Sequence, residues 1–313
     1  MHARAVIFEQ PGKLSIDQVE LVDPGDDDLV VDVDWSGIST GTEKLLWTGD
    51  MPPFPGLKYP LVPGYETVGR VVDAAPAYQN RIGDRVYVPG SAGYKDVRGL
   101  FGGSASKIVV KADKARTIDP GLGKNAILLA LAATAHHALA AKGAALPELI
   151  VGHGVLGRLL ARITLALGGP APVVWDIDAA RRDGAQGYDV RDPSDDAGRT
   201  YNTIYDVSGA SGILDQLIQH VSPAGEIVLA GFYSGRVDFA FPPAFMKEAR
   251  MRVAAEWKPA DMEAVLAFLD QGRLSLSGLV THEAECTDAA RAYDQAFNDP
   301  TCLKMVLNWS AEA

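Results

Sequence analysis

The first 120 residues of the chain alternate between short hydrophobic runs and turn-forming residues. The runs are rich in β-branched side chains, and Gly or Pro separates each from the next: ARAVIF, DLVVDVDWSGI, TVGRVVDAA, GDRVYVPG and ASKIVVKAD. Short apolar runs with turn signals roughly every 8–12 residues are typical of antiparallel strands joined by tight turns. We therefore predict a compact antiparallel β domain over residues 1–122.

Beyond about residue 123 the hydrophobic period changes, and longer helical stretches alternate with short apolar runs. A helix rich in Ala and Leu is expected over 124–146. Strands and helices then alternate, with strands ELIVG, PVVWDID, TIYDVSG, EIVLAGF and RMRVAAEW and helices LGRLLARITLALGG, AARRDGAQ and GILDQLIQHVSP. Strands that alternate with helices of roughly 10–15 residues form βαβ units on a parallel sheet. The sequence thus predicts an α/β protein whose second domain spans 123–256.

The last stretch of the chain, 257–313, is expected to form a return segment. It carries a helix over 261–271, a strand in GLVTHEAE, a helix over 287–298 and a strand in LKMVLNW. A stretch of this length is too short to bury a core of its own. We expect it to pack back on the N-terminal β domain.

Composition and charge restrict the classes of function. Of the 313 residues, 47% are hydrophobic and 22% are charged, as in an ordinary globular protein. The formal net charge of −11 argues against nucleic acid as a partner, because phosphate binding needs clustered Lys and Arg. The sequence shows no signal core and no run near the roughly 18 apolar residues of a membrane span. Cys286 and Cys302 are too few for a disulfide framework, so a reducing cytoplasm is the expected location.

The stretch LIVGHGVLGRLLAR contains the pattern G-x-G-x-x-G. It follows a predicted strand and opens a predicted helix, which is the context that gives the pattern its meaning. Gly152 would make the tight turn, Gly154 would let the backbone approach a pyrophosphate, and Gly157 would let helix pack closely on strand. The phosphates would bind the free N–H groups at the helix start, where Val155 and Leu156 lie. A dinucleotide cofactor is predicted here.

Asp176 ends the next strand and indicates which dinucleotide binds. It follows Gly152 at about the 20-residue spacing of the acidic residue that hydrogen-bonds the ribose hydroxyls. A carboxylate there would repel a 2′-phosphate, so NAD is favoured over NADP. Arg181 and Arg182 argue the other way, because guanidinium groups could accept that phosphate. His153, between two glycines, is expected to be an exposed loop residue.

Four stretches carry a resemblance that spans the chain: GYETVGRVVDAA, GISTGTE, GDRVYVPG and YDVSGASGILDQLIQHVSPAGEIVLAGF. They resemble motifs of the medium-chain dehydrogenase/reductase superfamily, whose members join a GroES-like catalytic domain to a Rossmann domain with a doubly wound parallel sheet. The resemblance implies an oxidoreductase with a nicotinamide cofactor. It also implies that the cofactor contacts Thr134, Ser208 and Gly231.

The residues that bind the catalytic zinc of this superfamily are replaced in this sequence. Tyr65 stands at the histidine position, Thr40 or Ser39 stands at the first cysteine, and the third ligand falls near Ala130. Glu66 alone could bind metal, whereas zinc needs three protein ligands. We therefore expect no metal. Ser39 and Thr40 are expected to be turn hydroxyls that bond their own backbone.

Residues 36–66, SGISTGTEKLLWTGDMPPFPGLKYPLVPGYE, are similar to a narrower group, the dehydrogenases of bacteriochlorophyll a biosynthesis. Those enzymes oxidise the 3-(1-hydroxyethyl) group of a bacteriochlorophyllide or chlorophyllide to acetyl and pass the hydride to NAD. The resemblance implies the same reaction here, with a tetrapyrrole as the small-molecule substrate. The loop over 47–60 would offer the macrocycle an apolar surface, unless its side chains merely fold the loop down: Trp47, Met51, Phe54 and Tyr59.

Without zinc, side chains must take the alcohol proton and stabilise the developing charge. Thr42 stands at the family's proton-relay hydroxyl, so we expect a relay from the substrate through Thr42 to solvent. Tyr65 would hydrogen-bond the substrate oxygen, or act as acid and base if its pKa were lowered. Lys44 would lower that pKa or pair with a propionate of the tetrapyrrole. Two alternatives stay open: Tyr65 as a packed aromatic, and Glu66 as a structural ion pair or backbone cap.

Two other functions fit the same residues. One is a zinc-free NADPH reductase of the quinone or enoyl type, for which loss of zinc is typical, although Asp176 argues against it. The other is a non-catalytic subunit that binds the cofactor or the pigment. The strand RMRVAAEW could pair two chains into a homodimer, and a hydrophobic pigment could require transient contact with a membrane or with other enzymes of its pathway.

Overall fold

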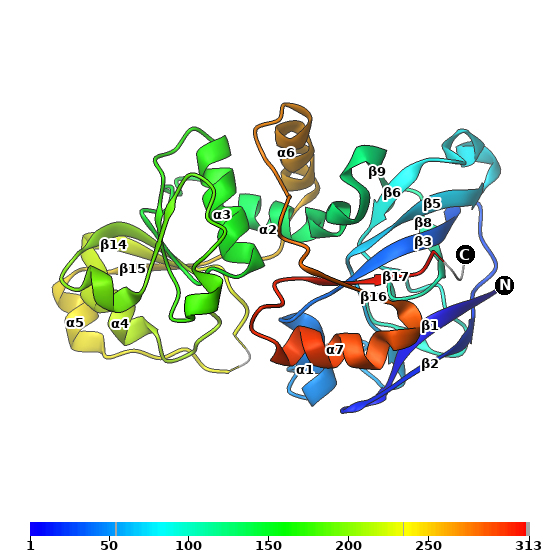
Figure 1. Cartoon of the computed structure of the whole chain (residues 1–313), viewed down its shortest axis with the longest axis horizontal. Coiled ribbons are helices and arrows are strands. Elements are labelled where there is room, and N and C mark those ends of the chain that lie inside the picture. Colours follow the sequence, from blue (N-terminus) through cyan, green and yellow to red (C-terminus); the bar gives the residue numbers. More distant parts are fainter. Residues whose placement is uncertain (54, 234, 311–313) are drawn as a thin grey trace. The chain divides into compact units, whose positions relative to one another are not determined.

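The computed structural model describes residues 1–53, 55–233 and 235–310 (Figure 1). The chain forms two compact units, one of residues 1–129 with 277–313 and one of residues 130–276. The sequence placed these boundaries at 122 and 257. Residues 257–276, expected in the return segment, belong to the second unit. Within the described residues, no helix is both long and apolar enough to cross a membrane.

Two β-sheets form the first unit. One has the order β16-β17-β3-β5-β6-β9 with β8 paired to β3, and the other has the order β2-β1-β4-β7. Only the pairs β4–β7 and β16–β17 are parallel among the described strands of this unit, so the predicted antiparallel β domain is confirmed. The strands are β1 (His2–Gln10), β2 (Lys13–Glu20), β3 (Asp28–Ile38), β4 (Leu61–Val62), β5 (Thr67–Ala74), β6 (Arg85–Val88), β7 (Arg98–Gly99), β8 (Lys107–Lys111), β9 (Arg116–Thr117), β16 (His282–Glu285) and β17 (Met305–Asn308).

The end of the chain is built into this unit. Strand β17 pairs antiparallel with β3, with Met305 opposite Ile38. Helix α7 (Ala289–Asn298) packs on the β core, where the Tyr293 ring meets the Phe8 ring edge-on at 5.2 Å between centroids. A short helix that the sequence pattern did not predict, α1 (Thr42–Thr48), follows β3 and ends at Gly49 with φ of 81°. Residues near both ends of the chain therefore surround α1 and the end of β3 (Figure 1).

The second unit contains a six-stranded parallel sheet of order β12-β11-β10-β13-β14-β15. This is the strand order of a dinucleotide-binding Rossmann fold, so the predicted α/β architecture is confirmed. The elements are α2 (Leu129–Leu139), β10 (Leu149–Val151), α3 (Val155–Ala166), β11 (Val173–Trp175), β12 (Asp189–Arg191), β13 (Tyr201–Asp206), α4 (Leu214–His220), β14 (Val221–Leu229), α5 (Phe241–Met246), β15 (Arg250–Val253) and α6 (Pro259–Asp270). Ligands of such sheets bind beyond the carboxyl ends of the strands.

Two predicted helices differ from the structure. The helix expected in AARRDGAQ is reduced to a single 3₁₀ turn, Ala179–Arg181. Gly184 beyond it has φ of 81°, outside the helical region, and Arg158 Nη2 donates to the Arg181 and Asp183 carbonyl oxygens, which a continuing helix would use for its own N–H groups. The helix expected over 124–146 is divided into a 3₁₀ segment, Pro120–Leu128, and α2.

Candidate active site

A cluster of three hydroxyl groups in the first unit includes residues at the positions where zinc-dependent members of the superfamily carry their metal ligands. The Tyr65 hydroxyl lies 2.7 Å from Ser39 Oγ and 3.5 Å from Thr42 Oγ1. Ser39 follows β3, Thr42 begins α1, and Tyr65 lies between β4 and β5. The structure thus brings together two of the predicted catalytic residues, Thr42 and Tyr65. It adds Ser39, whose hydroxyl had been expected to bond its own backbone and instead bonds Tyr65.

The backbone around Tyr65 fixes the direction of its side chain. Gly64 has φ of 97°, and a Cβ there would lie 2.8 Å from the Ser104 backbone nitrogen, so only glycine fits this turn. The Tyr65 carbonyl oxygen accepts a hydrogen bond from the Tyr87 hydroxyl at 2.8 Å. The Tyr65 ring meets the Phe101 ring edge-on, with 5.2 Å between the centroids. The phenol therefore points at Ser39 and Thr42 from a rigid support.

The Tyr65 phenol stays neutral at physiological pH. Burial raises its pKa well above the ordinary value, and the negative charge of Glu66 raises the pKa further. Lys44 does not lower it: this residue is exposed, and its Nζ donates to the Phe297 carbonyl oxygen at 2.9 Å. The hypothesis of a tyrosine with a lowered pKa is therefore wrong. Tyr65 can donate a hydrogen bond or pass a proton along, but it does not provide a resting phenolate.

Glu66 forms a buried ion pair. Its two carboxylate oxygens lie 2.7 Å and 2.9 Å from Lys304 Nζ, and both side chains are almost fully buried. Lys304 also donates to the Ile38 carbonyl oxygen at 3.3 Å, and Gly37 leaves the room that the carboxylate needs. The structural ion-pair interpretation of Glu66 is confirmed. Its charge is already matched by a lysine.

Glu43 is a buried carboxyl that the sequence pattern did not single out. Its Oε1 accepts a hydrogen bond from Ser39 N–H at 3.1 Å, and its Oε2 accepts one from the Tyr293 hydroxyl at 2.6 Å. Burial raises the pKa of Glu43 to about 7, and the charge of Glu66 adds to the effect. A glutamate in the first turn of a helix is common, so only its burial marks it as unusual.

The side chains at this place do not fit a zinc ion. Within residues 1–53, 55–233 and 235–310, no three His, Cys, Asp or Glu side chains gather in a group that could hold a metal. The ligand positions carry the hydroxyls of Ser39 and Tyr65, and the carboxylate of Glu66 is occupied by Lys304. Zinc sites are built from thiolate, imidazole and carboxylate ligands.

The apolar residues of the 47–60 loop pack on the β core. The Trp47 ring meets Phe8 edge-on at 5.5 Å, and the Tyr59 hydroxyl donates to the Leu46 carbonyl oxygen. Met51 and Tyr59 are partly buried against the same core. These contacts match the alternative in which the aromatic residues fold the loop down. Phe54 lies outside the described residues.

The glycine-rich loop of the second unit has the geometry that its sequence predicted. Gly152 has φ of 104°, and a Cβ on Gly157 would lie 1.8 Å from the Gly152 carbonyl oxygen. No atom lies within 4 Å of a Cβ built on Gly154, so the loop is open where a pyrophosphate would approach. Helix α3 begins at Val155, and the N–H groups of its first turn, including Leu156, have no partner within the helix. The loop can therefore hold a dinucleotide.

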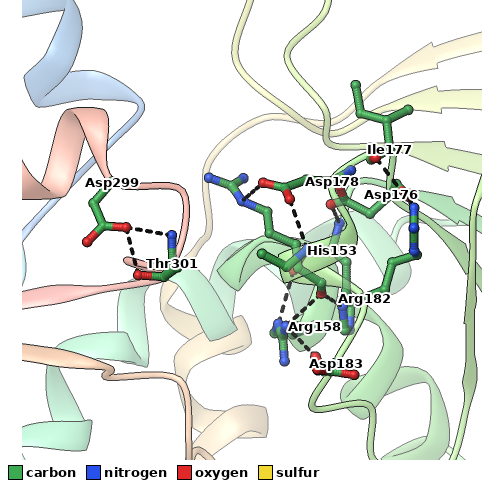
Figure 2. A network of polar contacts seen from close by, with 11 residues as sticks. His153, Arg158, Asp176, Ile177, Asp178, Arg182, Asp183, Asp299 and Thr301 are labelled. Carbon is green, nitrogen blue, oxygen red and sulfur yellow. Dashed lines mark hydrogen bonds and ion pairs between the residues drawn. The ribbon is translucent and has the colours of Figure 1, made fainter.

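Asp176 supports this loop from the end of β11. Its Oδ2 accepts a hydrogen bond from His153 N–H at 2.8 Å, and its Oδ1 accepts one from Asp178 N–H at 2.9 Å. A carboxylate has room for about four hydrogen bonds, so ribose hydroxyls could add to these two. Figure 2 shows the carboxylate beside the loop.

The three other predicted cofactor residues lie in two places. Ser208 follows β13, and its Cα lies 3.3 Å from a Cβ built on Gly152. Gly231 follows β14, where its N–H donates to the Asp206 carbonyl oxygen at 3.0 Å. Both lie at the carboxyl edge of the sheet, with the glycine-rich loop. Thr134 lies in α2, where its hydroxyl donates to the Ala130 carbonyl oxygen at 2.9 Å.

His153 is buried, which corrects the expectation of an exposed loop residue. Its Nδ1–H donates to the Arg181 carbonyl oxygen at 2.6 Å, and its Nε2 accepts from the Tyr188 hydroxyl at 2.8 Å. Burial lowers the pKa of His153 to about 4, and the nearby charge of Arg158 lowers it further. The imidazole is therefore neutral and structural.

Buried Arg158 ties the loop after β11 to α3. Its Nε donates to the His153 carbonyl oxygen at 3.0 Å, and its Nη2 donates to the Arg181 and Asp183 carbonyl oxygens at 2.9 Å and 2.7 Å. Arg182 forms an ion pair with Asp192 at 2.8 Å. Figure 2 shows Arg158 beside Asp183, with dashed lines for its hydrogen bonds.

Known proteins resemble this chain along its length. Residues 25–119 match the family described as the alcohol dehydrogenase GroES-like domain. The 2-desacetyl-2-hydroxyethyl bacteriochlorophyllide A dehydrogenase of Rhodobacter capsulatus is 56% identical over 310 residues, which are 99% of each chain. The chain belongs to the bacteriochlorophyllide dehydrogenase family. A second member of that name, from Cereibacter sphaeroides, is 54% identical over 100% of both chains.

More distant dehydrogenases share the fold of this bacteriochlorophyllide dehydrogenase family. A solved alcohol dehydrogenase from E. coli CFT073, complexed with NADH, has a TM-score of 0.83 at 22% identity and covers 98% of this chain and 99% of its own. The 2R,3R-butanediol dehydrogenase of Bacillus subtilis has the same TM-score at 20% identity and the same coverage. The chain is thus an oxidoreductase of the alcohol dehydrogenase type, as its motifs predicted.

Proposed function

We propose that this protein oxidises the 1-hydroxyethyl side chain of a bacteriochlorophyllide or chlorophyllide to an acetyl group, with NAD as the hydride acceptor. The observation that carries the proposal is the full-length identity of 56% to the R. capsulatus enzyme, whose name states such a substrate. The reaction removes one hydride from the carbinol carbon and one proton from its oxygen. The nicotinamide, when bound, accepts the hydride, so the side chains of the protein must handle the proton.

The hydroxyl cluster can move this proton. As the substrate oxygen loses its proton to the Tyr65 hydroxyl, Tyr65 passes its own proton to Thr42 Oγ1 at 3.5 Å, while Ser39 Oγ at 2.7 Å holds the Tyr65 hydroxyl in place. Thr42 is partly exposed, so it can release the proton to solvent. The raised pKa of Tyr65 suits a neutral group that accepts one proton as it gives up another.

Independence of zinc is part of the proposal. What supports it is the chemistry of the side chains at the ligand positions. Hydroxyls replace the thiolate and imidazole, and Lys304 neutralises Glu66. The ketone that forms is conjugated with the macrocycle, which reduces the stabilisation that the protein must supply.

The third part of the proposal is that the protein prefers NAD to NADP. Asp176 places its carboxylate beside the glycine-rich loop, where it would accept hydrogen bonds from ribose hydroxyls and repel a 2′-phosphate. Arg182, which could have attracted that phosphate, is paired with Asp192. Both observations support NAD.

The test combines purified protein, NAD and a chlorophyllide that carries the 1-hydroxyethyl group. Conversion to acetyl extends the conjugation of the macrocycle, so its absorption should shift to the red as NADH forms. A protein that leaves the pigment unchanged and reduces quinones with NADPH would be a reductase instead. A protein that binds pigment or cofactor without turnover would be the non-catalytic subunit.

We also propose that two chains pair along β15, the last strand of the six-stranded sheet. Val253 on this strand is 76% exposed, and Phe241 and Phe245 on neighbouring α5 are 65% and 64% exposed. An unpaired strand edge beside exposed aromatic residues favours pairing with another sheet edge. Light scattering of wild type and Val253→Asp should give a dimer and a monomer, and a monomeric wild type would overturn the proposal.

A further inference from the structure

Glu43 makes a hydrogen bond to each of the two backbone polar groups of Ser39, its N–H and its carbonyl oxygen. The Glu43 side chain has 0% of its surface exposed. Its Oε1 accepts from Ser39 N–H at 3.1 Å, and its own N–H donates to the Ser39 carbonyl oxygen at 3.1 Å. The second carboxylate oxygen accepts from the Tyr293 hydroxyl of α7 at 2.6 Å. One buried carboxyl therefore joins the end of β3 to α7.

Because the Ser39 Oγ atom lies 2.7 Å from the Tyr65 hydroxyl, fixing the position of Ser39 also fixes the position of that hydroxyl. We propose that Glu43 is a positioning residue whose ionised form, acting through Ser39, places the Tyr65 hydroxyl for proton transfer. The proposal rests on the proposed function, since it concerns the same proton. Glu43 itself contacts neither the Tyr65 nor the Thr42 hydroxyl in the hydrogen bonds that the structure records, so its effect is indirect.

The charged and titratable groups that act on Glu43 or that it acts on come from several elements of the first unit. They are Glu66 before β5, Lys304 before β17, Tyr293 of α7 and Tyr65, while Lys44 on its own helix is exposed and bonded to Phe297. Burial and the charge of Glu66 raise the pKa of Glu43, whereas the Tyr293 and Ser39 hydrogen bonds and the charge of Lys304 oppose them. The resulting pKa of about 7 places the change of protonation in the neutral range.

Protonation of Glu43 changes both of its hydrogen bonds. The bonds to Ser39 and Tyr293 are charge-assisted while the carboxylate is ionised, and a neutral carboxyl makes bonds about half as strong. The oxygen that carries the proton must donate, so the Tyr293 hydroxyl has to turn and accept. Ser39 is then held less firmly, and with it the Tyr65 hydroxyl. Turnover should therefore rise with pH through a midpoint near 7.

The test is the pH profile of Glu43→Gln, measured with NAD and the hydroxyethyl chlorophyllide. The amide keeps an oxygen for Ser39 N–H and an N–H for the Tyr293 oxygen, so it imitates the protonated carboxyl at every pH. We expect kcat at pH 8 to fall about tenfold or more, as for a slightly misplaced reacting group, with KM for the pigment unchanged. The midpoint near 7 should disappear. A variant with the wild-type midpoint and kcat would overturn the proposal.

Two further variants separate positioning from a merely structural role. Tyr293→Phe removes a hydrogen bond that favours the ionised carboxylate, so the midpoint should move up by about one to two pH units. Glu285→Gln removes an exposed carboxyl of the same unit and should keep the wild-type profile. An unmoved midpoint in Tyr293→Phe would overturn the proposal even if Glu43→Gln failed to fold.

Infrared spectroscopy of the substrate-free protein separates this proposal from the proposed function. The absorption of a protonated carboxyl should titrate near pH 7 in the wild type and be absent in Glu43→Gln. If this band is present but no pigment is oxidised, the proposed function fails while the proton site stands. If pigment is oxidised but no such band exists, the positioning proposal fails and the function stands.

Discussion

Replacing Glu43 by Gln should stabilise the first unit at alkaline pH. The buried carboxyl has its pKa raised from 4.5 to about 7. A group whose pKa is raised by folding contributes stability that is complete below its unfolded pKa and is lost as the pH rises through its folded pKa. The wild type should therefore lose this stability between pH 4.5 and 7, whereas the amide does not titrate.

The magnitude follows from the shift. A difference of roughly 2.5 pKa units corresponds to about 3.4 kcal/mol at most. Linkage places about 0.8 kcal/mol of this loss at pH 5 and about 3.3 kcal/mol at pH 8, so the two proteins should diverge by about 2.5 kcal/mol. At about 2–4 °C per kcal/mol for a unit of this size, the midpoints should separate by about 5–10 °C.

The assay is thermal unfolding of wild type and Glu43→Gln at pH 5 and pH 8. Other groups titrate equally in both proteins, so the difference between them isolates Glu43. Near-ultraviolet circular dichroism reports the packed aromatic side chains of both units, among them Tyr65 and Tyr293 of the first unit. If the midpoints of the two proteins change by the same amount between the two pH values, Glu43 is ionised at both, and the argument from its burial is wrong.

Three other experiments test the remaining contacts. Tyr65→Phe should lower turnover at least about tenfold, because it removes the central hydroxyl of the cluster; wild-type turnover would mean that the Tyr65 ring only packs against its neighbours. Lys304→Met should cost about 3–5 kcal/mol in thermal unfolding, because it leaves the Glu66 charge buried without a partner. Adding Glu66→Gln should recover much of that loss, and an equal loss in the double variant would contradict the ion-pair account. Asp176→Ala should weaken NAD more than NADP in a fluorescence titration, and equal losses would exclude the ribose role.

Short-range patterns predicted the architecture. The strand, glycine-rich loop and helix over 149–166 depend on neighbouring residues, and the structure reproduces them. The alternation of strands and helices likewise predicted the parallel sheet. The helix expected in AARRDGAQ does not form, because Gly184 has a left-handed backbone and Arg158, far away in sequence, donates to the Arg181 and Asp183 carbonyl oxygens.

The candidate site could be predicted from the sequence only in part, because its decisive contacts join residues far apart in the chain. Thr42 and Tyr65 were found through a resemblance, and Ser39 was assigned to a turn because its partner lies 26 residues away. Glu66 and Lys304 are separated by 238 residues, and Glu43 and Tyr293 by 250. Burial, which shifts the pKa of Glu43 upward and that of His153 downward, depends on the folded environment and has no local pattern.

The central claim is that a hydroxyl cluster, in place of a metal ion, serves the oxidation of the carbinol. The most direct test is turnover of the hydroxyethyl chlorophyllide with NAD after exhaustive treatment with a chelator, with metal content measured on the same sample. The account predicts wild-type turnover, with one NADH formed for each acetyl group, in protein that contains far less than one metal ion per chain. Loss of turnover that added Zn²⁺ restores would contradict it.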